Sequence, residues 1–324
     1  IGAWTDNGTM IIAIEDDQGH TVDGPHDGVV IDDGKWHHIA GVFDRTNNTM
    51  TRYVDGVQTG TVTDISAVTG SINPTADLTI GAYNNGASGL FNGTIDEVRL
   101  WNVARSQAEI RANMSKMLAG TEAELVGYWR FDEGTGNTTY DHSGNNNQGT
   151  LTNMEEADWV ISGAPIGDES AFDYDLTDGF SATLAHTDGD NLTATTTSGT
   201  ISGIQVYRVD ATPMRPDATA LGGLTLYEER YWGVFVIGAD NPEYTVIYNY
   251  EGHPGISDED ELELVFRDDL ADDSWEDLNA ALDVDANTLT KTGQPGTEYA
   301  LASVPPPTIG AGKALVFDGS NEYV

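Results

Sequence analysis

The sequence predicts an all-β protein made of two domains. Short runs of alternating apolar and polar residues recur along the chain, and clusters of Gly, Asn, Asp and Thr separate them, with 37 Gly among the 324 residues. Such alternation is typical of strands that bury one face, and the clusters are typical of turns. Helix signals are few, and the length suffices for two domains that each bury a core.

The expected strands of the first half follow one another at short intervals. In chain order they are residues 10–14, 29–31, 35–42, 49–54, 57–63, 77–82, 91–101 and 125–131. The dipeptide Asp55-Gly56 between two of them is typical of a tight hairpin, because both residues tolerate a positive φ.

One short α-helix is predicted near residues 106–117. Ser106 stands at an N-cap position and Glu109 follows three residues later, which is the pattern of a capping box. Ala108, Ile110 and Ala112 favour the helix that this box would start.

Asp96 is the first candidate site residue. In a strand it shares a face with Val98 and Leu100, whose side chains we expect to point into a core. A carboxylate at the rim of that core needs a cation or several hydrogen-bond donors, because burying a bare charge is costly.

Four motifs carry a family resemblance. GTIDEVRLWNVARSQAEI at 93–110, DDGKWHHIAGVFD at 32–44, YVDGV at 53–57 and LTIGAYNNG at 78–86 resemble laminin-G-like domains of the concanavalin A-like lectin/glucanase group. The resemblance covers residues 1–164 and implies a two-sheet antiparallel jelly roll whose first strands are missing. It also implies a domain that often holds structural calcium and mostly binds glycans or proteins rather than catalysing reactions.

The same resemblance implies a calcium ion beside Asp96. Calcium takes about six to eight oxygen ligands, several of them carboxylates. The segment that borders the domain and the opening strand would supply further carboxylates, from Asp132, Asp141 and Asp318.

Other interpretations of these residues stay open. Asp96 could instead accept hydrogen bonds from backbone amides or pair with Arg99 or Arg130. The Gly- and Asn-rich loop at 141–149 could wrap a cation or form a solvated turn, and the sequence DGDN at 188–191 has the same two interpretations.

The second half predicts another β-sandwich at residues 165–304. Alternating runs lie at 181–185, 201–209, 231–237, 244–250, 262–266 and 299–303. The last part, from residue 275 to 303, resembles segments between modules of large secreted surface proteins of the Bacteroidota.

Residues 305–324 begin with three prolines, which form a stiff linker. Residues 312–324 then resemble the opening strand of a further laminin-G-like domain. The simplest account is a window cut from a tandem array. The alternative is a strand that completes the first domain of this chain or of a neighbour.

Composition limits the possible partners. The chain carries 14 basic and 53 acidic side chains, a net charge of −39, which disfavours nucleic acid and anionic lipid. It has no Cys, no apolar run long enough to span a membrane and no visible signal peptide. The Glu-x-Asp-x-x-Glu run of related glucanases is also absent from the sequence.

These observations predict a non-catalytic structural and adhesive repeat of a large secreted or cell-surface protein. It would be stabilised by calcium and could assemble into filaments. Its expected partners are neighbouring repeats or copies, with glycans or cell-surface proteins as further partners. The alternative is a carbohydrate-binding module attached to an enzyme outside this segment.

Overall fold

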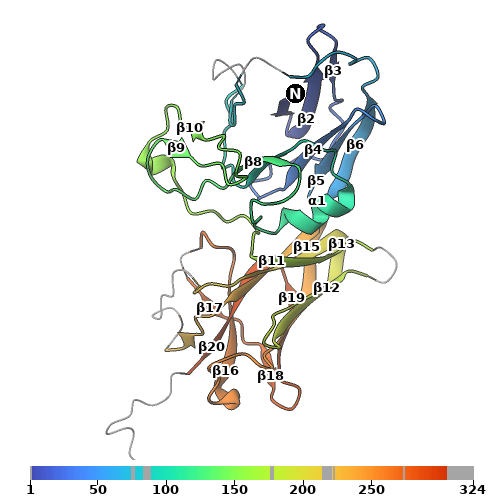
Figure 1. The fold of residues 1–324 in the computed structure, drawn as a ribbon. Helices are drawn as coiled ribbons and strands as arrows, with labels where there is room; N and C mark the ends of the chain where they lie inside the picture. Colours follow the sequence, from blue (N-terminus) through green and yellow to red (C-terminus); the bar gives the residue numbers. More distant parts are fainter. Residues whose placement is uncertain are drawn as a thin grey trace, which may run out of the picture.

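The chain forms two lobes, one above the other in Figure 1. The computed structural model describes residues 2–73, 77–82, 89–175, 179–213, 221, 223–272 and 274–304. We call the part from β1 to β10 the N-lobe and the part from β11 to β20 the C-lobe. The described residues include no helix long and apolar enough to cross a membrane.

The N-lobe is built from small antiparallel sheets. Its strands are β1 (Gly2–Asp6), β2 (Thr9–Glu15), β3 (Thr21–Asp23), β4 (Ile39–Asp44), β5 (Thr49–Val54), β6 (Val57–Asp64), β7 (Val98–Trp101), β8 (Leu125–Trp129), β9 (Thr138–Thr139) and β10 (Gly149–Thr150). They pair as β1-β2-β3, β4-β5-β6, β7-β8 and β9-β10.

The core of the N-lobe lies between β2 and the β4-β5-β6 sheet. Its buried members are Met10, Ile12, Ile14, Met50, Ile65 and Val68. The hairpin between β5 and β6 has the predicted turn, because Asp55 and Gly56 have φ values of 50° and 72°.

The predicted helix is confirmed as α1 (Gln107–Met114). The Ser106 hydroxyl accepts from the Glu109 amide, and the Glu109 carboxylate accepts from the Ser106 amide, so the capping box forms. The helix ends at Met114 rather than near residue 117, because the chain turns at Ser115 to meet the C-lobe.

The C-lobe is one ten-stranded antiparallel sheet that folds over on itself. Its elements are β11 (Glu169–Asp173), β12 (Ser181–Ala185), β13 (Asn191–Val209), β14 (Thr225–Leu226), β15 (Tyr231–Asn249), β16 (Leu262–Arg267), β17 (Glu276–Asp277), β18 (Ala281–Asp283), β19 (Thr288–Gln294) and β20 (Thr297–Ser303). Two short 3₁₀ turns, Glu156–Asp158 and Glu259–Glu261, complete the elements.

The long strands β13 and β15 make the sandwich. They pair along nearly their whole length, with register shifts between Thr196 and Gly203, and such bulges bend a strand pair. One end of the pair joins β12, β19 and β18, and the other end joins β11, β20, β16 and β17. The all-β class predicted from the sequence is therefore confirmed.

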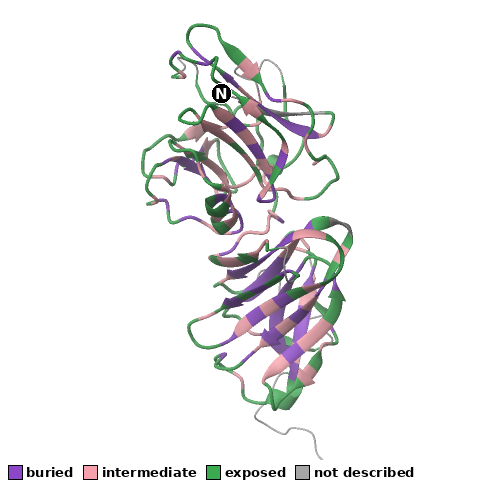
Figure 2. Cartoon of the chain, turned by 90° about the vertical axis from the view of Figure 1, so that its right-hand side faces the viewer, coloured by how far each residue is buried: buried purple, intermediate pink, exposed green. Residues whose placement is uncertain are grey.

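One core fills the space between the two layers (Figure 2). It contains Trp232, Tyr244, Tyr248 and Tyr299, which are at most 1% exposed. Strand β20 is buried on both faces, because Leu221, Leu226 and Trp275 cover its outer side.

Four of the predicted strands are wrong in extent. Residues 29–31 contribute only an isolated bridge between Val30 and Thr9, and β4 begins at Ile39 rather than at residue 35. Residues 77–82 form no strand, and the run at 91–101 forms one only from Val98. An alternation of apolar and polar residues indicates a segment that could be a strand. The segment becomes a strand only where a neighbouring strand supplies backbone hydrogen bonds.

Candidate functional site

The surroundings of Asp96 differ from the predicted strand face. Glu97 has a φ of 54°, which interrupts the regular alternation immediately before β7. Leu100 is 45% exposed, whereas the side chains of Glu97 and Arg99 are only 12% and 9% exposed. The expectation that Leu100 points into the core is therefore wrong.

Glu97 receives hydrogen bonds from two elements. Its Oε2 accepts from the Tyr128 hydroxyl and from Arg99 Nη2, both at 2.6 Å. Arg99 also donates to the carbonyls of Asn113 and Lys116, at 2.6 and 2.7 Å. Glu97 and Arg99 thus connect β7 and β8 to the end of α1.

Asp96 is half-buried beside two other carboxylates. Burial raises its pKa, and the charges of Glu97 and Asp132 add to that rise, although a hydrogen bond with Ser162 opposes it. Arg130 pairs with Asp132 at 3.0 Å, and no ion pair to Asp96 is found among the described residues. The charges of Glu97 and Asp132 therefore reach Asp96, although the three carboxylates do not form a group of ligand atoms within 4.8 Å among the described residues.

Asp141 belongs to a separate arrangement. Its Oδ1 accepts from the amides of Tyr128 and Ser143 at 3.0 and 2.9 Å, and its Oδ2 accepts from the Asn147 amide at 2.9 Å. Burial alone would raise its pKa, but these hydrogen bonds outweigh it and the pKa is lowered. Asp141 fastens its loop to β8, in agreement with the turn interpretation. Asp318 lies outside the described residues.

The C-lobe holds a cluster that the sequence analysis did not assemble. One ligand atom from each of His186, Asp188 and Asp190 lies within 4.8 Å of the others, so the three could hold a metal ion. The prediction for residues 188–191 offered a loop that wraps a cation or a solvated turn, and it did not include His186. The spacing His-x-Asp-x-Asp at 186–190 was the signal that could have found it.

A guanidinium already binds the carboxylates of this cluster. Arg230 donates to Asp190 Oδ1 at 2.6 Å and to Asp188 Oδ1 and Oδ2 at 3.0 and 2.6 Å. The Tyr248 hydroxyl donates to Asp190 Oδ2 at 2.5 Å, and His186 Nδ1 lies 2.7 Å from Asp188 Oδ1. A metal ion would have to displace Arg230, which acts as the cation of the cluster.

The two carboxylates of the cluster titrate differently. Burial and the neighbouring Asp188 raise the pKa of Asp190 to about 6, although a hydrogen bond from Tyr248 opposes the shift. Hydrogen bonds from Arg230 hold the pKa of Asp188 far below its usual range. One raised and one lowered pKa in a pair of carboxylates is an arrangement that suits proton transfer. Two carboxylates that share one arginine also produce it, without any such role.

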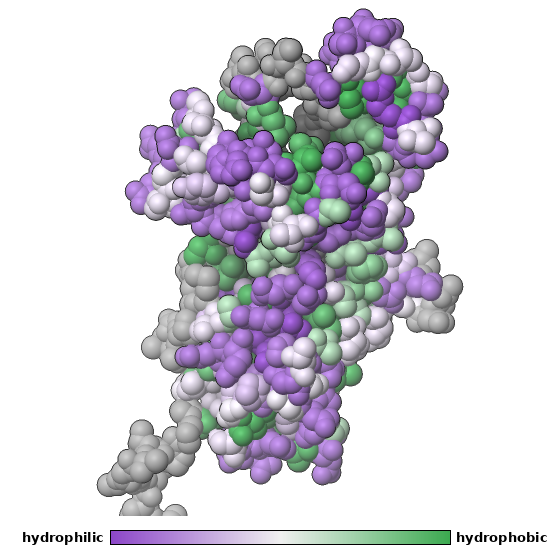
Figure 3. All heavy atoms as spheres, in the orientation of Figure 1, coloured by the Kyte–Doolittle hydropathy of each residue, from purple (hydrophilic) through white to green (hydrophobic). Residues whose placement is uncertain are grey.

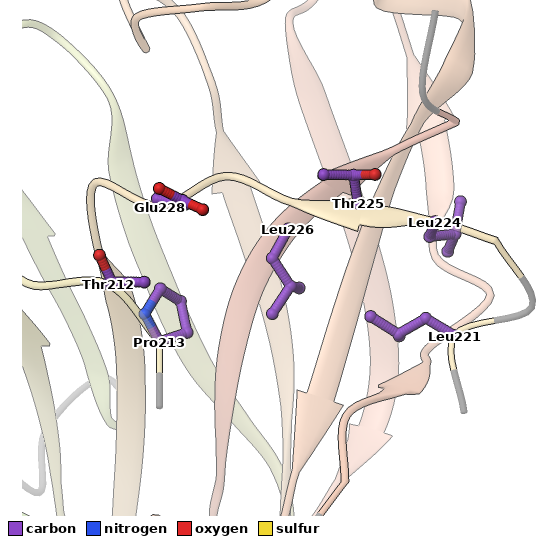
Figure 4. Close-up of a pocket in the computed structure, with 7 residues that line it drawn as sticks. All are labelled: Thr212, Pro213, Leu221, Leu224, Thr225, Leu226 and Glu228. Atoms are coloured by element: carbon purple, nitrogen blue, oxygen red, sulfur yellow. The ribbon is translucent and has the colours of Figure 1, made fainter. Parts of the chain in front are cut away.

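A hollow of about 190 Å³ lies beside β14 (Figure 4). Its lining is Thr212, Pro213, Leu221, Leu224, Thr225, Leu226 and Glu228. Glu228 is the one ionisable group among these residues, so the described part of the lining offers no pair of acids for glycoside hydrolysis.

Tyr174, which follows β11, connects the two lobes. Its hydroxyl donates to the Asp55 carbonyl at 2.9 Å and accepts from Gln205 Nε2 at 3.2 Å. The guanidinium carbon of Arg111 lies 3.9 Å from the centre of its ring. Tyr174 therefore contacts the β5–β6 hairpin, α1 and β13 at once.

Two glycines make space for this tyrosine. A Cβ at Gly203 would lie 2.4 Å from the Tyr174 ring, and one at Gly56 would lie 2.8 Å from its hydroxyl. The Gly56 carbonyl also accepts from Gln107 Nε2 and Arg111 Nε, at 2.9 and 2.8 Å. Side chains larger than glycine at 56 or 203 would push the lobes apart.

Backbone pairing reinforces the junction. Lys116 and Gly167 form a parallel bridge, and the Met117 amide donates to the Gly167 carbonyl at 2.8 Å. Lys116 Nζ donates to Glu169 Oε2 at 2.7 Å. The end of α1 is thus bound to the start of β11.

Comparison with known proteins finds a match for the first part of the chain. Residues 2–111 match the laminin-G-type family model of the concanavalin A-like lectin/glucanases superfamily. No curated protein and no solved structure matches the chain. A domain of this superfamily is compatible with a lectin-like or a structural module.

Proposed function

We propose that the chain is a non-catalytic structural and adhesive module of a large secreted or cell-surface protein, whose partners are neighbouring repeats or copies. The junction around Tyr174 carries this proposal. Side chains and backbone from α1, the β5–β6 hairpin, β11 and β13 meet there. A contact formed by so many elements supports a fixed angle between the lobes, which a spacing module needs and a flexible tether does not.

The test is a substitution of Tyr174 with a matched control. Tyr174→Ala removes the ring and should cost about 3 kcal/mol, and it should split a single calorimetric transition into two as the lobes uncouple. Tyr174→Phe keeps the ring and loses only the hydroxyl bonds, with a cost of about 1 kcal/mol. Two separate transitions in the unaltered protein, or no effect of Tyr174→Ala on coupling, would refute the rigid-module proposal.

Calcium at Asp96 is the second part of the proposal. Asp96, Glu97 and Asp132 lie close enough to raise the pKa of Asp96, and a bound cation would relieve this repulsion. Carbonyl oxygens and water would have to complete the ligands. The acidic composition, 53 Asp and Glu against 14 Lys and Arg, further supports a role for divalent cations.

Thermal melting tests the calcium site. We expect millimolar calcium to raise the melting temperature relative to a chelator, since a ligand that binds only the folded state stabilises it. Asp96→Asn should abolish that difference, whereas Asp141→Asn should lower stability in both conditions because it breaks the loop. Equal melting temperatures with calcium and with chelator would contradict the proposed calcium site.

A carbohydrate-binding module is the alternative, and one surface feature favours it. Arg111, Phe172, Asp173, Tyr174 and Asp175 line an open hollow at the junction, and Phe172 is 38% exposed. An aromatic face beside polar groups suits a sugar ring. Binding on a glycan array that Phe172→Ala abolishes would favour this alternative. Hydrolysis of a polysaccharide by the chain would exclude both functions.

A further inference from the structure

His37, two residues before β4, lies between two carboxylates. Its Nδ1 is 2.8 Å from Asp55 Oδ2, and its Nε2 is 3.1 Å from Asp33 Oδ1. An ionised carboxylate only accepts hydrogen bonds, and a neutral imidazole carries a single N–H. Both hydrogen bonds can therefore exist together only when the His37 ring is a charged imidazolium.

The buried partner of His37 belongs to the lobe junction. Asp55 is 6% exposed, and its Oδ1 accepts from the His38 amide at 2.8 Å. The Asp55 carbonyl accepts from the Tyr174 hydroxyl at 2.9 Å, and the next carbonyl, that of Gly56, accepts from two side chains of α1. The turn that His37 holds through its carboxylate is thus the turn to which both α1 and the C-lobe attach.

We propose that His37 is a pH-sensitive clamp on the lobe junction: its imidazolium fixes the Asp55 turn, and loss of the proton at alkaline pH weakens the contact with Tyr174. This rests on the proposed function, because it adds a regulation to the same junction between the lobes.

The charged groups around the turn favour a protonated His37. The hydrogen bond to Asp55 raises the pKa of His37, and Asp33 adds to the rise, although partial burial opposes it. Desolvation, with the charge of Arg99, lowers the pKa of His38 to about 3, so His38 stays neutral. Arg111, the cation of α1 at this turn, stays charged at every relevant pH. Of these groups, His37 is the one that changes charge near neutral pH.

The remainder of the molecule acts in the same direction. Hydrophilic residues cover much of both lobes on the face shown in Figure 3, and the net charge of the chain is −39. A negative surrounding potential favours the charged form of an imidazole.

The sign of the pH dependence follows from the raised pKa. Folded His37 holds its proton more tightly than an ordinary histidine with a pKa of 6.5. Its stabilisation is therefore complete below that pH and is lost as the pH rises through the folded value. A neutral ring leaves one carboxylate facing a nitrogen lone pair, and the buried Asp55 loses the positive charge beside it.

Scanning calorimetry of the full chain between about pH 6.5 and 9.5 tests the clamp. His37→Gln cannot titrate and serves as the reference. Relative to it, the melting temperature of the unaltered protein should fall by at least about 2 °C over this range. The single transition of the unaltered protein should also begin to separate into two as the lobes uncouple.

Two further variants guard against a simple loss of folding. Asp33→Asn changes a side chain that is 42% exposed and leaves Asp55 in place. The His37 ring, followed by NMR, should titrate above pH 6.5 in the unaltered protein and at a lower pH in Asp33→Asn. His20→Gln breaks a similar pair, between His20 Nδ1 and Asp16 Oδ2 at 2.9 Å, outside the junction, and should leave the pH dependence of the lobe coupling unchanged.

A His37 ring that titrates at or below pH 6.5 would overturn the proposal, as would the same pH dependence in His37→Gln as in the unaltered protein. The proposed function fails in a different way. Two transitions already present at about pH 6.5, where the imidazolium is intact, would refute the rigid coupling of the lobes. One transition that does not respond to pH would overturn only the role of His37.

Discussion

Buried arginines bind carboxylates in this acidic chain. Arg52, Arg230 and Arg267 are 2%, 5% and 1% exposed. Arg52 pairs with Asp27 at 2.5 Å, and Arg267 pairs with Glu298 at 2.6 Å. Removing one partner of such a pair leaves an uncompensated charge, which typically costs about 3–5 kcal/mol. A chain with 14 basic residues has few cations to replace them.

The Asp188–Asp190 pair gives a testable pH dependence. Folded Asp190 keeps its proton up to about pH 6, whereas an ordinary aspartate loses it near 3.8. The stabilisation from this proton is therefore complete below about pH 4 and is lost as the pH rises through about 6. Because Asn cannot titrate, the stability of the unaltered protein relative to Asp190→Asn should fall by about 1–2 kcal/mol over this window.

Urea denaturation of both proteins at several pH values measures this difference. Asp188 serves as an internal control, because its lowered pKa gives stability that is present above about pH 4 and lost as the pH falls below it. Parallel curves for the two proteins between about pH 4 and 7 would contradict the assignment to Asp190.

At the scale of elements, α1 links the helix cap to the lobe junction. Gln107 and Arg111 of this helix donate to the Gly56 carbonyl, and the Arg111 carbonyl accepts from Gln205 Nε2 at 3.1 Å. An eight-residue helix is marginal by itself. Its cap therefore stabilises both the helix and the contact between the lobes.

Ser106→Ala should lower the free energy of unfolding by about 1 kcal/mol, because the capping box loses its side-chain acceptor. Ser106→Asp keeps an acceptor at the cap and should restore most of the loss. Chemical denaturation compares the three proteins. A neutral effect of Ser106→Ala would mean that packing of the buried Ile110 and Met114 alone holds the helix.

At the scale of the whole molecule, self-repulsion opposes folding. The net charge of −39 is spread over a compact chain, and added salt screens charges beyond about 10 Å at 0.1 M. We expect the melting temperature to rise by several degrees from low salt to about 0.5 M NaCl.

A control for this effect removes exposed charge without touching the core. Glu259→Gln with Glu261→Gln neutralises two exposed acids and should reduce the salt dependence. Differential scanning calorimetry over a range of NaCl concentrations measures the melting temperatures of the unaltered protein and of this double variant. A melting temperature that falls with salt would show that ion pairs, rather than repulsion, dominate the electrostatics.

Local patterns predicted the elements whose determinants lie close together in the sequence. The capping box of α1, the Asp55-Gly56 hairpin and most C-lobe strands follow from residues a few positions apart. The runs at 201–209 and 244–250 were correct as strands, but they are parts of the longer β13 and β15. Bulges that bend a strand depend on the layers it must join, which no local pattern contains.

The candidate sites needed contacts between distant residues. The predicted strand placed Leu100 inside, but in the structure the face that carries Glu97 and Arg99 is the more buried one. The local sequence of residues 188–191 allowed a cation-binding loop or a turn. In the structure, Arg230 and Tyr248, about forty to sixty positions later, bind the buried Asp190. Charge pairing of this kind depends on which loops the fold brings together.

The sequence by itself determined the all-β class, the first lobe's superfamily motifs, the helix cap and the acidic surface, because each depends on composition or on short-range spacing. Only the tertiary structure decided which carboxylate meets which arginine, that Tyr174 joins the lobes, and that residues 77–82 belong to no sheet of the described residues. The reason is physical: charge compensation and strand pairing are completed by neighbours in space, and the sequence order does not specify those neighbours.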